Sequence, residues 1–181
     1  MKTLKYLLIT ALFTLLLAVP GHAMDKENTL LLDLPAGRVI IEMYPKLAPQ
    51  HVKRIKELVR MKFYDGIVFH RVIDGFMAQG GDPTGTGMGG SGKNLPAEFS
   101  KEKFVRGTVA MARANDPNSG DSQFFICFNR VPSLDGKYTI WGKVVSGMEF
   151  VDKIKKGTGR NGMVTDPDAI VSIQVASDVY K

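Results

Sequence analysis

Apolar residues occur along this chain mostly in short extended runs, and this pattern predicts a mainly β protein. Residues 29–34 and 39–44 form two such runs joined by Pro35-Ala36-Gly37, which predicts a β-hairpin. Further runs rich in β-branched and aromatic residues predict strands at 67–73, 76–79, 108–112, 123–128, 138–145 and 170–176. Turn residues such as Asp65-Gly66 and Asp135-Gly136 separate them.

Two segments change to a helical period. Within residues 48–61, apolar side chains at Val52, Ile55 and Leu58 recur at helical spacing, and Pro49 suits the first turn of a helix. Residues 149–156 predict a second, shorter helix that ends at Gly157. About eight strands and two helices in one domain favour a closed eight-stranded antiparallel barrel with two capping α-helices.

Composition and charge narrow the class of protein. In 181 residues, 44% hydrophobic and 23% charged residues are typical of a globular domain and exclude a disordered chain. The net charge of +6 comes from scattered basic residues, without the basic patch and interleaved aromatics that a nucleic-acid partner requires. The single cysteine excludes an intrachain disulfide and a cysteine-based zinc cluster.

The first 23 residues have the layout of a secretory signal peptide. Lys2 and Lys5 precede an uncharged run at 6–19, and Gly21-His22-Ala23 places small residues before a cleavage point. The alternative is an uncleaved membrane anchor, but a spanning helix needs roughly 20 apolar residues. We therefore predict cleavage after Ala23, no stable membrane insertion afterwards, and a domain of residues 24–181 that is periplasmic or secreted.

Three other candidate chemistries lack support in the sequence. Residues 87–93 have the spacing of a phosphate-binding loop, but Asn94 replaces its Ser or Thr and no helix is predicted to follow, so we interpret them as a mobile surface loop. Cys127 lies within an apolar run and is predicted to be a buried, inert thiol. His51, expected to be exposed on the first helix, and His70 form no metal-binding pattern, so no metal is predicted.

Four segments together carry a family resemblance. Residues 69–82 read Phe-His-Arg-Val-Ile-Asp-Gly-Phe-Met-Ala-Gln-Gly-Gly-Asp, and 122–126 read Ser-Gln-Phe-Phe-Ile. With Leu-Asp-Gly-Lys at 134–137 and Trp-Gly-Lys-Val at 141–144, they resemble the cyclophilins, which are peptidyl-prolyl cis-trans isomerases. The resemblance extends over about residues 28–177, and the family's barrel with two helices agrees with the pattern above.

The resemblance implies a role for each matching residue. Arg71 matches the catalytic arginine, which donates to the prolyl nitrogen of a twisted X-Pro amide, and Gln79 matches the glutamine that positions it. An apolar pocket for the proline ring is matched by Phe76, Met77, Phe125 and Leu134. Ala112, Arg113, Ala114 and Gln123 match positions lining the groove for the residues before proline, and Tyr138 matches the pocket wall.

Three positions depart from the best-known eukaryotic members. Arg113 stands where they carry Asn, in a contact made by the backbone. Tyr138 stands where they carry His, and keeps a flat ring with a polar hydroxyl. Ser133 stands where members that bind the drug cyclosporin carry Trp. These departures imply an active isomerase with weak cyclosporin binding.

The resemblance also implies what the protein works with. Its partners would be proline-containing polypeptides, it would need no cofactor, and we expect a monomer that assists the folding of exported proteins. The alternative is a non-catalytic cyclophilin-like module that holds peptide as a chaperone. Arg71 favours the enzyme, because binding alone has no need of a cation over the prolyl nitrogen.

Overall fold

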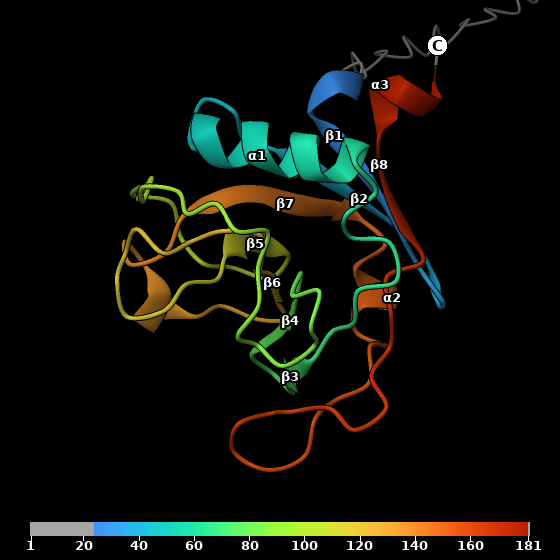
Figure 1. The fold of residues 1–181 in the computed structure, drawn as a ribbon, viewed down its shortest axis with the longest axis vertical. Helices are drawn as coiled ribbons and strands as arrows, with labels where there is room; N and C mark the ends of the chain where they lie inside the picture. Colours follow the sequence, from blue (N-terminus) through green and yellow to red (C-terminus); the bar gives the residue numbers. More distant parts are fainter. Residues whose placement is uncertain (1–23, 181) are drawn as a thin grey trace, which may run out of the picture.

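The computed structural model describes residues 24–180, so the predicted signal peptide lies outside the described residues. One antiparallel sheet contains the strands in the order β3-β4-β6-β5-β7-β2-β1-β8 (Figure 1). The strands are β1 (Thr29–Leu34), β2 (Gly37–Met43), β3 (Arg71–Ile73), β4 (Met77–Gly80), β5 (Thr108–Met111), β6 (Phe124–Cys127), β7 (Ile140–Ser146) and β8 (Ser172–Val175). The helices are α1 (Pro49–Arg60), α2 (Met148–Val151) and α3 (Ala176–Val179), with 3₁₀ turns η1 (Lys26–Asn28) and η2 (Pro132–Leu134).

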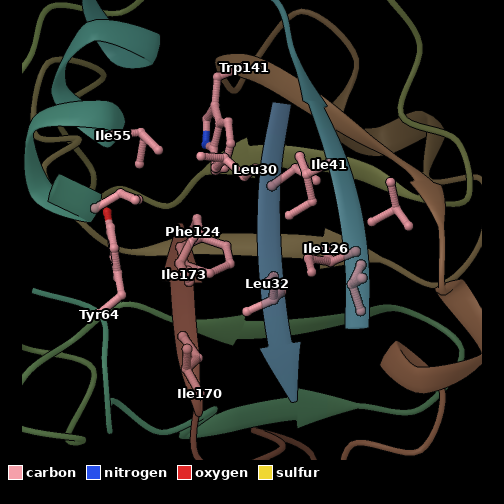
Figure 2. Packing of buried hydrophobic residues seen from close by; sticks show 14 of the residues in the cluster. Leu30, Leu32, Ile41, Ile55, Tyr64, Phe124, Ile126, Trp141, Ile170 and Ile173 are labelled. Carbon is pink, nitrogen blue, oxygen red and sulfur yellow. The ribbon is translucent and has the colours of Figure 1, made fainter. Parts of the chain in front are cut away.

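The main hydrophobic core fills the interior of the curled sheet. Leu30 and Leu32 of β1 extend into it with Phe124 of β6, as Figure 2 shows. The ring of Trp141 meets Phe124 edge-to-face, with 5.9 Å between centroids. Helix α1 covers one end of this interior (Figure 1) and buries Ile55 with its neighbours at helical spacing. The predicted hairpin of β1 and β2 and the predicted first helix are therefore confirmed.

The prediction that His51 is exposed is wrong. Its side chain is 2% exposed, and Nδ1 lies 2.6 Å from Oε2 of Glu98. His51 is one turn before Ile55, so the period that buries Ile55 also turns His51 inward. The Glu98 carboxylate also accepts the backbone N–H groups of Gln50 and His51, which caps the first turn of α1 from a distant loop.

The second predicted helix is shorter than expected. Helix α2 covers only Met148–Val151, after which Lys153 N and Ile154 N donate to carbonyls three residues back instead of four. The chain thus leaves α2 in tight turns that bury Ile154. A third helix, α3, begins at Ala176, where the pattern predicted the end of a strand.

The sheet is curled and open, so the predicted closed barrel is wrong. Its end strands are β3 and β8, and the segments beside them meet only through isolated bridges such as Val68 with Ala169 and Arg71 with Met163. Strand β3 forms a continuous ladder with β4, but none with β8. The loop that precedes β8 occupies this edge instead, with Val72 N donating to Gly162 O and Phe69 N to Asp168 O.

The prediction for Cys127 is confirmed. Its side chain is fully buried in β6, and burial raises the pKa of the thiol to about 12, so it stays protonated at neutral pH. Residues 24–180 contain no helix with the length and apolar character needed to cross a bilayer.

Candidate functional site

The candidate site lies on the face of the sheet opposite the main core. In the antiparallel register, Arg71 of β3 pairs with Gln79 of β4, and Gln79 pairs with Phe125 of β6. Directly paired residues point to the same face, so these three side chains form one row across three strands. Their neighbours Val72, Ala78 and Phe124 point to the other face and belong to the main core.

A small apolar pocket adjoins this row. It is formed by the residues predicted to hold a proline ring and by the predicted wall residue: Phe76, Met77, Phe125, Leu134 and Tyr138. Phe125 meets the Tyr138 ring edge-to-face at 5.8 Å and stacks on Phe104 at 6.1 Å between centroids. Met77, Phe104 and Phe125 belong to a second buried cluster, so the floor of the pocket is rigidly packed.

Arg71 lies at the rim of the apolar pocket with its guanidinium held from two sides. Nε donates to the backbone carbonyl of Asn161 at 2.9 Å, and Nη1 donates to Oε1 of Gln79 at 3.1 Å. Within residues 24–180, Nη2 makes no hydrogen bond. Burial lowers the pKa of Arg71, but a guanidinium remains charged at neutral pH. The site thus presents a fixed cation with unused donors beside an apolar pocket.

A chain of side-chain amides leads from Arg71 to a second depression, here called the side groove. Nε2 of Gln79 donates to Oε1 of Gln123 at 2.9 Å, and Nε2 of Gln123 donates to the carbonyls of Gly87 and Gly89. The side groove is lined by the Gly-rich loop (residues 83–94), by Ala112–Ala114 and by Asp121. Its volume of about 350 Å³ exceeds the roughly 120 Å³ of the apolar pocket, so it has room for larger groups.

Asp82 anchors the Gly-rich loop from beneath. Its carboxylate, in a residue only 1% exposed, accepts the hydroxyl of Thr84 and the backbone N–H groups of Thr84, Gly87 and Gly89. Although burial raises the pKa of Asp82, the hydrogen bonds from Thr84, Gly89 and Gly87 lower it to about 2. The segment that looked like a phosphate-binding loop is therefore a surface loop organised around a buried carboxylate, and no helix follows it.

We expect Asp82→Asn to lower the free energy of unfolding by about 2 kcal/mol at pH 7, because it removes charge-assisted hydrogen bonds in a buried site. A carboxylate whose folded-state pKa is about 2 rather than 3.8 stabilises the fold above pH 3.8, and this contribution disappears as the pH falls toward 2. Other carboxylates with lowered pKa values, such as Glu27 and Asp135, also contribute to acid destabilisation. Denaturant unfolding across pH 2–7 should therefore show a larger acid-dependent loss of stability in the wild type than in Asp82→Asn. Asp74→Asn is the control, because the Asp74 side chain is exposed. If Asp74→Asn lowered the free energy of unfolding at pH 7 as much as Asp82→Asn, the prediction would be wrong.

All eleven residues predicted for the site line one of the two depressions. The apolar pocket is bordered by Arg71, Phe76, Met77, Gln79, Ala112, Arg113, Phe125, Leu134 and Tyr138, and the side groove adds Ala114 and Gln123. Gln79, Ala112 and Arg113 border both, so the two depressions form one continuous surface.

Sequence reasoning missed three contributors. Asn161 acts through its backbone carbonyl, which no side-chain pattern reveals. Phe104 lies beneath Phe125, and a lone buried aromatic in an irregular segment carries no motif. Asp121 borders the side groove and accepts the backbone N–H of Gly92.

The structure also places Arg113, Tyr138 and Ser133, the three positions at which the sequence departs from the best-known eukaryotic members of the family it resembles. The Arg113 guanidinium lies over the Tyr138 ring, with Cζ 4.5 Å from the centroid, and donates to the carbonyls of Ala114 and Lys137. It therefore links the loop of Ala112–Ala114 to the wall of the apolar pocket. Ser133 is exposed in η2, directly before the pocket residue Leu134.

Comparison with known proteins agrees with this arrangement. Residues 29–175 match the family described as cyclophilin type peptidyl-prolyl cis-trans isomerase/CLD. A probable peptidyl-prolyl cis-trans isomerase of Brucella suis is 54% identical over 171 residues, covering 87% of this chain and 87% of that protein. A peptidyl-prolyl cis-trans isomerase of Helicobacter pylori is 46% identical over 145 residues, covering 78% of this chain and 84% of its own length.

Solved structures show the same fold. A cyclophilin of Hirschia baltica is 30% identical, with a TM-score of 0.75 over 85% of this chain and 76% of that chain. A Cryptosporidium parvum cyclophilin, crystallised in the presence of the dipeptide Ala-Pro, is 31% identical, with a TM-score of 0.74 over 81% of this chain and 98% of that chain. With a matching family model over most of the chain and a relative above 50% identity, the protein belongs to the cyclophilin-type peptidyl-prolyl cis-trans isomerases.

Proposed function

We propose that Arg71 is the catalytic residue of this isomerase and that the apolar pocket of Phe76, Met77, Phe125 and Leu134 holds the ring of the reacting proline. The observation that carries the proposal is the placement of a guanidinium, fixed by Asn161 and Gln79, at the rim of a rigid apolar pocket. Such a pocket can hold the ring while the cation acts on the adjacent amide.

The chemistry requires only a change in how the amide is bound. An X-Pro bond has partial double-bond character and a rotation barrier of about 18–20 kcal/mol. When the bond twists, conjugation is lost and the lone pair of the prolyl nitrogen becomes available as an acceptor. A hydrogen bond donated by Arg71 to that nitrogen is therefore strong in the transition state and weak in either planar isomer. This difference accelerates the rotation.

The remaining site residues fit supporting roles. Gln79 accepts from Nη1 of Arg71 and is itself held by Gln123, so it orients the guanidinium and can contact substrate. Ala112, Arg113 and Ala114 border the surface that continues into the side groove, where the residues before proline would lie. The Cryptosporidium relative crystallised in the presence of Ala-Pro supports a proline-containing peptide as the substrate class. We further propose that the enzyme acts as a monomer, because residues 24–180 of one chain already form both depressions.

A proline-isomerisation assay tests the assignment. The purified protein should accelerate cis-trans exchange of a short X-Pro peptide, and Arg71→Ala should lose most of that acceleration while keeping its fold. If the wild type bound the peptide without accelerating exchange, the non-catalytic binding module would be the correct reading instead.

We also propose that the enzyme is exported through a cleavable signal peptide and assists the folding of proteins in the periplasm or outside the cell. The charged start, the uncharged run at 6–19 and the Gly-His-Ala sequence before residue 24 support this. Slow X-Pro isomerisation limits the folding of many chains, so an exported isomerase has substrates there.

The mature protein should begin at Met24. Intact-mass measurement of protein from the soluble exported fraction checks this, and a species that retains Met1 there would refute it. A matched variant, Ala23→Leu, should accumulate uncleaved, because the processing site requires a small residue directly before the cut.

A further inference from the structure

The open edge of the sheet is occupied by the loop between α2 and β8, and residues 157–163 of this loop lie along β3. Val72 N donates to the carbonyl of Gly162 at 2.7 Å, and Gly157 N donates to the carbonyl of Val72 at 2.9 Å. An isolated bridge pairs Met163 with Arg71. The loop therefore uses backbone groups of β3 that would otherwise be unpaired at a sheet edge.

This edge loop reaches the guanidinium of Arg71 directly. The Asn161 carbonyl accepts Nε–H at 2.9 Å, whereas Gln79 accepts from Nη1 at 3.1 Å. A guanidinium is planar, and two acceptors on different nitrogens determine both its position and its plane. Among residues 24–180, removing the Asn161 contact would leave the guanidinium with Gln79 and a long contact from Nη1 to the Met77 sulfur at 3.9 Å.

Glycine is required for the loop to approach β3 this closely. Gly162 has a φ of +70°, a conformation that L side chains rarely adopt, and a Cβ at this position would overlap the Ile73 side chain. A Cβ at Gly157 would overlap the Gly162 carbonyl. The position of the Asn161 carbonyl thus depends on glycines that contact β3 and not the substrate.

We infer that the edge loop is a positioning element for catalysis, with the Asn161 peptide group holding the Arg71 guanidinium in the plane that its reaction requires. The inference rests on the proposed catalytic role of Arg71. Proline binding uses the apolar pocket in every state of the amide, while the guanidinium acts mainly in the transition state. A displaced edge loop should therefore lower kcat and leave KM largely unchanged.

Gly162→Ala is the test. We expect kcat to fall about tenfold, equivalent to about 1.4 kcal/mol of transition-state stabilisation. The Nε–H resonance of Arg71, followed by NMR, should be protected from solvent exchange in the wild type and lose that protection in the variant. Gly66→Ala is the matched control, because Gly66 has a φ of +80° but no heavy atom within 4 Å of an added Cβ. It should keep both kcat and the protected resonance.

A double-mutant cycle separates positioning from general destabilisation. In an Arg71→Lys background, Gly162→Ala should cause no further loss of kcat, whereas a merely structural effect would add to it. If Gly162→Ala does not fold, one glycine inserted between the exposed residues Gly159 and Arg160 displaces Asn161 without touching the packed glycine.

The outcomes are distinguishable. An unprotected Nε–H in the wild type, or a folded variant that loses the protected resonance but keeps its kcat, would overturn the inference. If Arg71→Lys itself stays fully active, the proposed role of Arg71 fails instead. If Arg71→Lys loses activity while a folded Gly162→Ala keeps the wild-type kcat, only the role of the edge loop is rejected.

Discussion

Replacing Arg71 with lysine is expected to lower kcat/KM by roughly one to three orders of magnitude while the fold persists. Lysine keeps the positive charge but has a single ammonium group, which cannot hold the Asn161 carbonyl and Gln79 and still direct a planar donor at the prolyl nitrogen. The lost interaction belongs to the transition state, so the decrease should appear in kcat more than in KM.

Exchange between cis and trans forms of an X-Pro peptide, followed by NMR or by a protease-coupled assay, measures this effect. Arg38→Lys is the matched control, because Arg38 forms an exposed ion pair with Asp33 in the β1–β2 hairpin, away from the site residues. It should keep full activity. Near-normal turnover in Arg71→Lys would show that charge alone is sufficient and that the proposed hydrogen-bonding mechanism is wrong.

The second large effect concerns inhibition by cyclosporin. The wild type is expected to bind the drug weakly, since Ser133 stands where drug-sensitive cyclophilins carry Trp. At about 25 cal/mol per Å², a tryptophan that contributes on the order of 100 Å² of contact is worth about 2.5 kcal/mol. Its indole donor adds about 0.5–1.5 kcal/mol. Together these correspond to two to three orders of magnitude in affinity.

Ser133→Trp should therefore gain roughly 100-fold or more in cyclosporin affinity. Ser133 is exposed and immediately precedes Leu134, so a tryptophan there would extend the wall of the apolar pocket without disturbing the core. Turnover of short peptides should change little, because they need less of that wall than the macrocycle does. Titration of isomerase activity with the drug measures both quantities.

Ser133→Ala is the control for this substitution. It removes the hydroxyl without adding apolar area, so its inhibition should equal that of the wild type. Tight inhibition of the wild type, or no gain in Ser133→Trp, would mean that another position controls drug binding. Arg113, whose guanidinium lies over the Tyr138 ring in the pocket wall, would then be the next residue to substitute.

The sequence by itself determined the features that depend on local pattern. Two extended apolar runs joined by Pro35-Ala36-Gly37 predicted the β1–β2 hairpin, and helical spacing from Val52 to Leu58 predicted α1. Motifs at 69–82 and 122–126 carried the family resemblance, and that resemblance identified the candidate site residues. These features are encoded in side chains, which the sequence lists directly.

Tertiary structure decided whatever depends on contacts between distant segments. Whether β3 pairs with β8 depends on the path of a loop almost a hundred residues further along the chain, and that loop leaves the sheet open. His51 can stay buried on the inner face of α1 because Glu98, from a distant loop, pairs with its ring nitrogen and caps the helix. The hydrogen bond that Arg71 donates to Asn161 is accepted by a backbone carbonyl. Every residue has this group, so only the three-dimensional path of the chain could assign the contact.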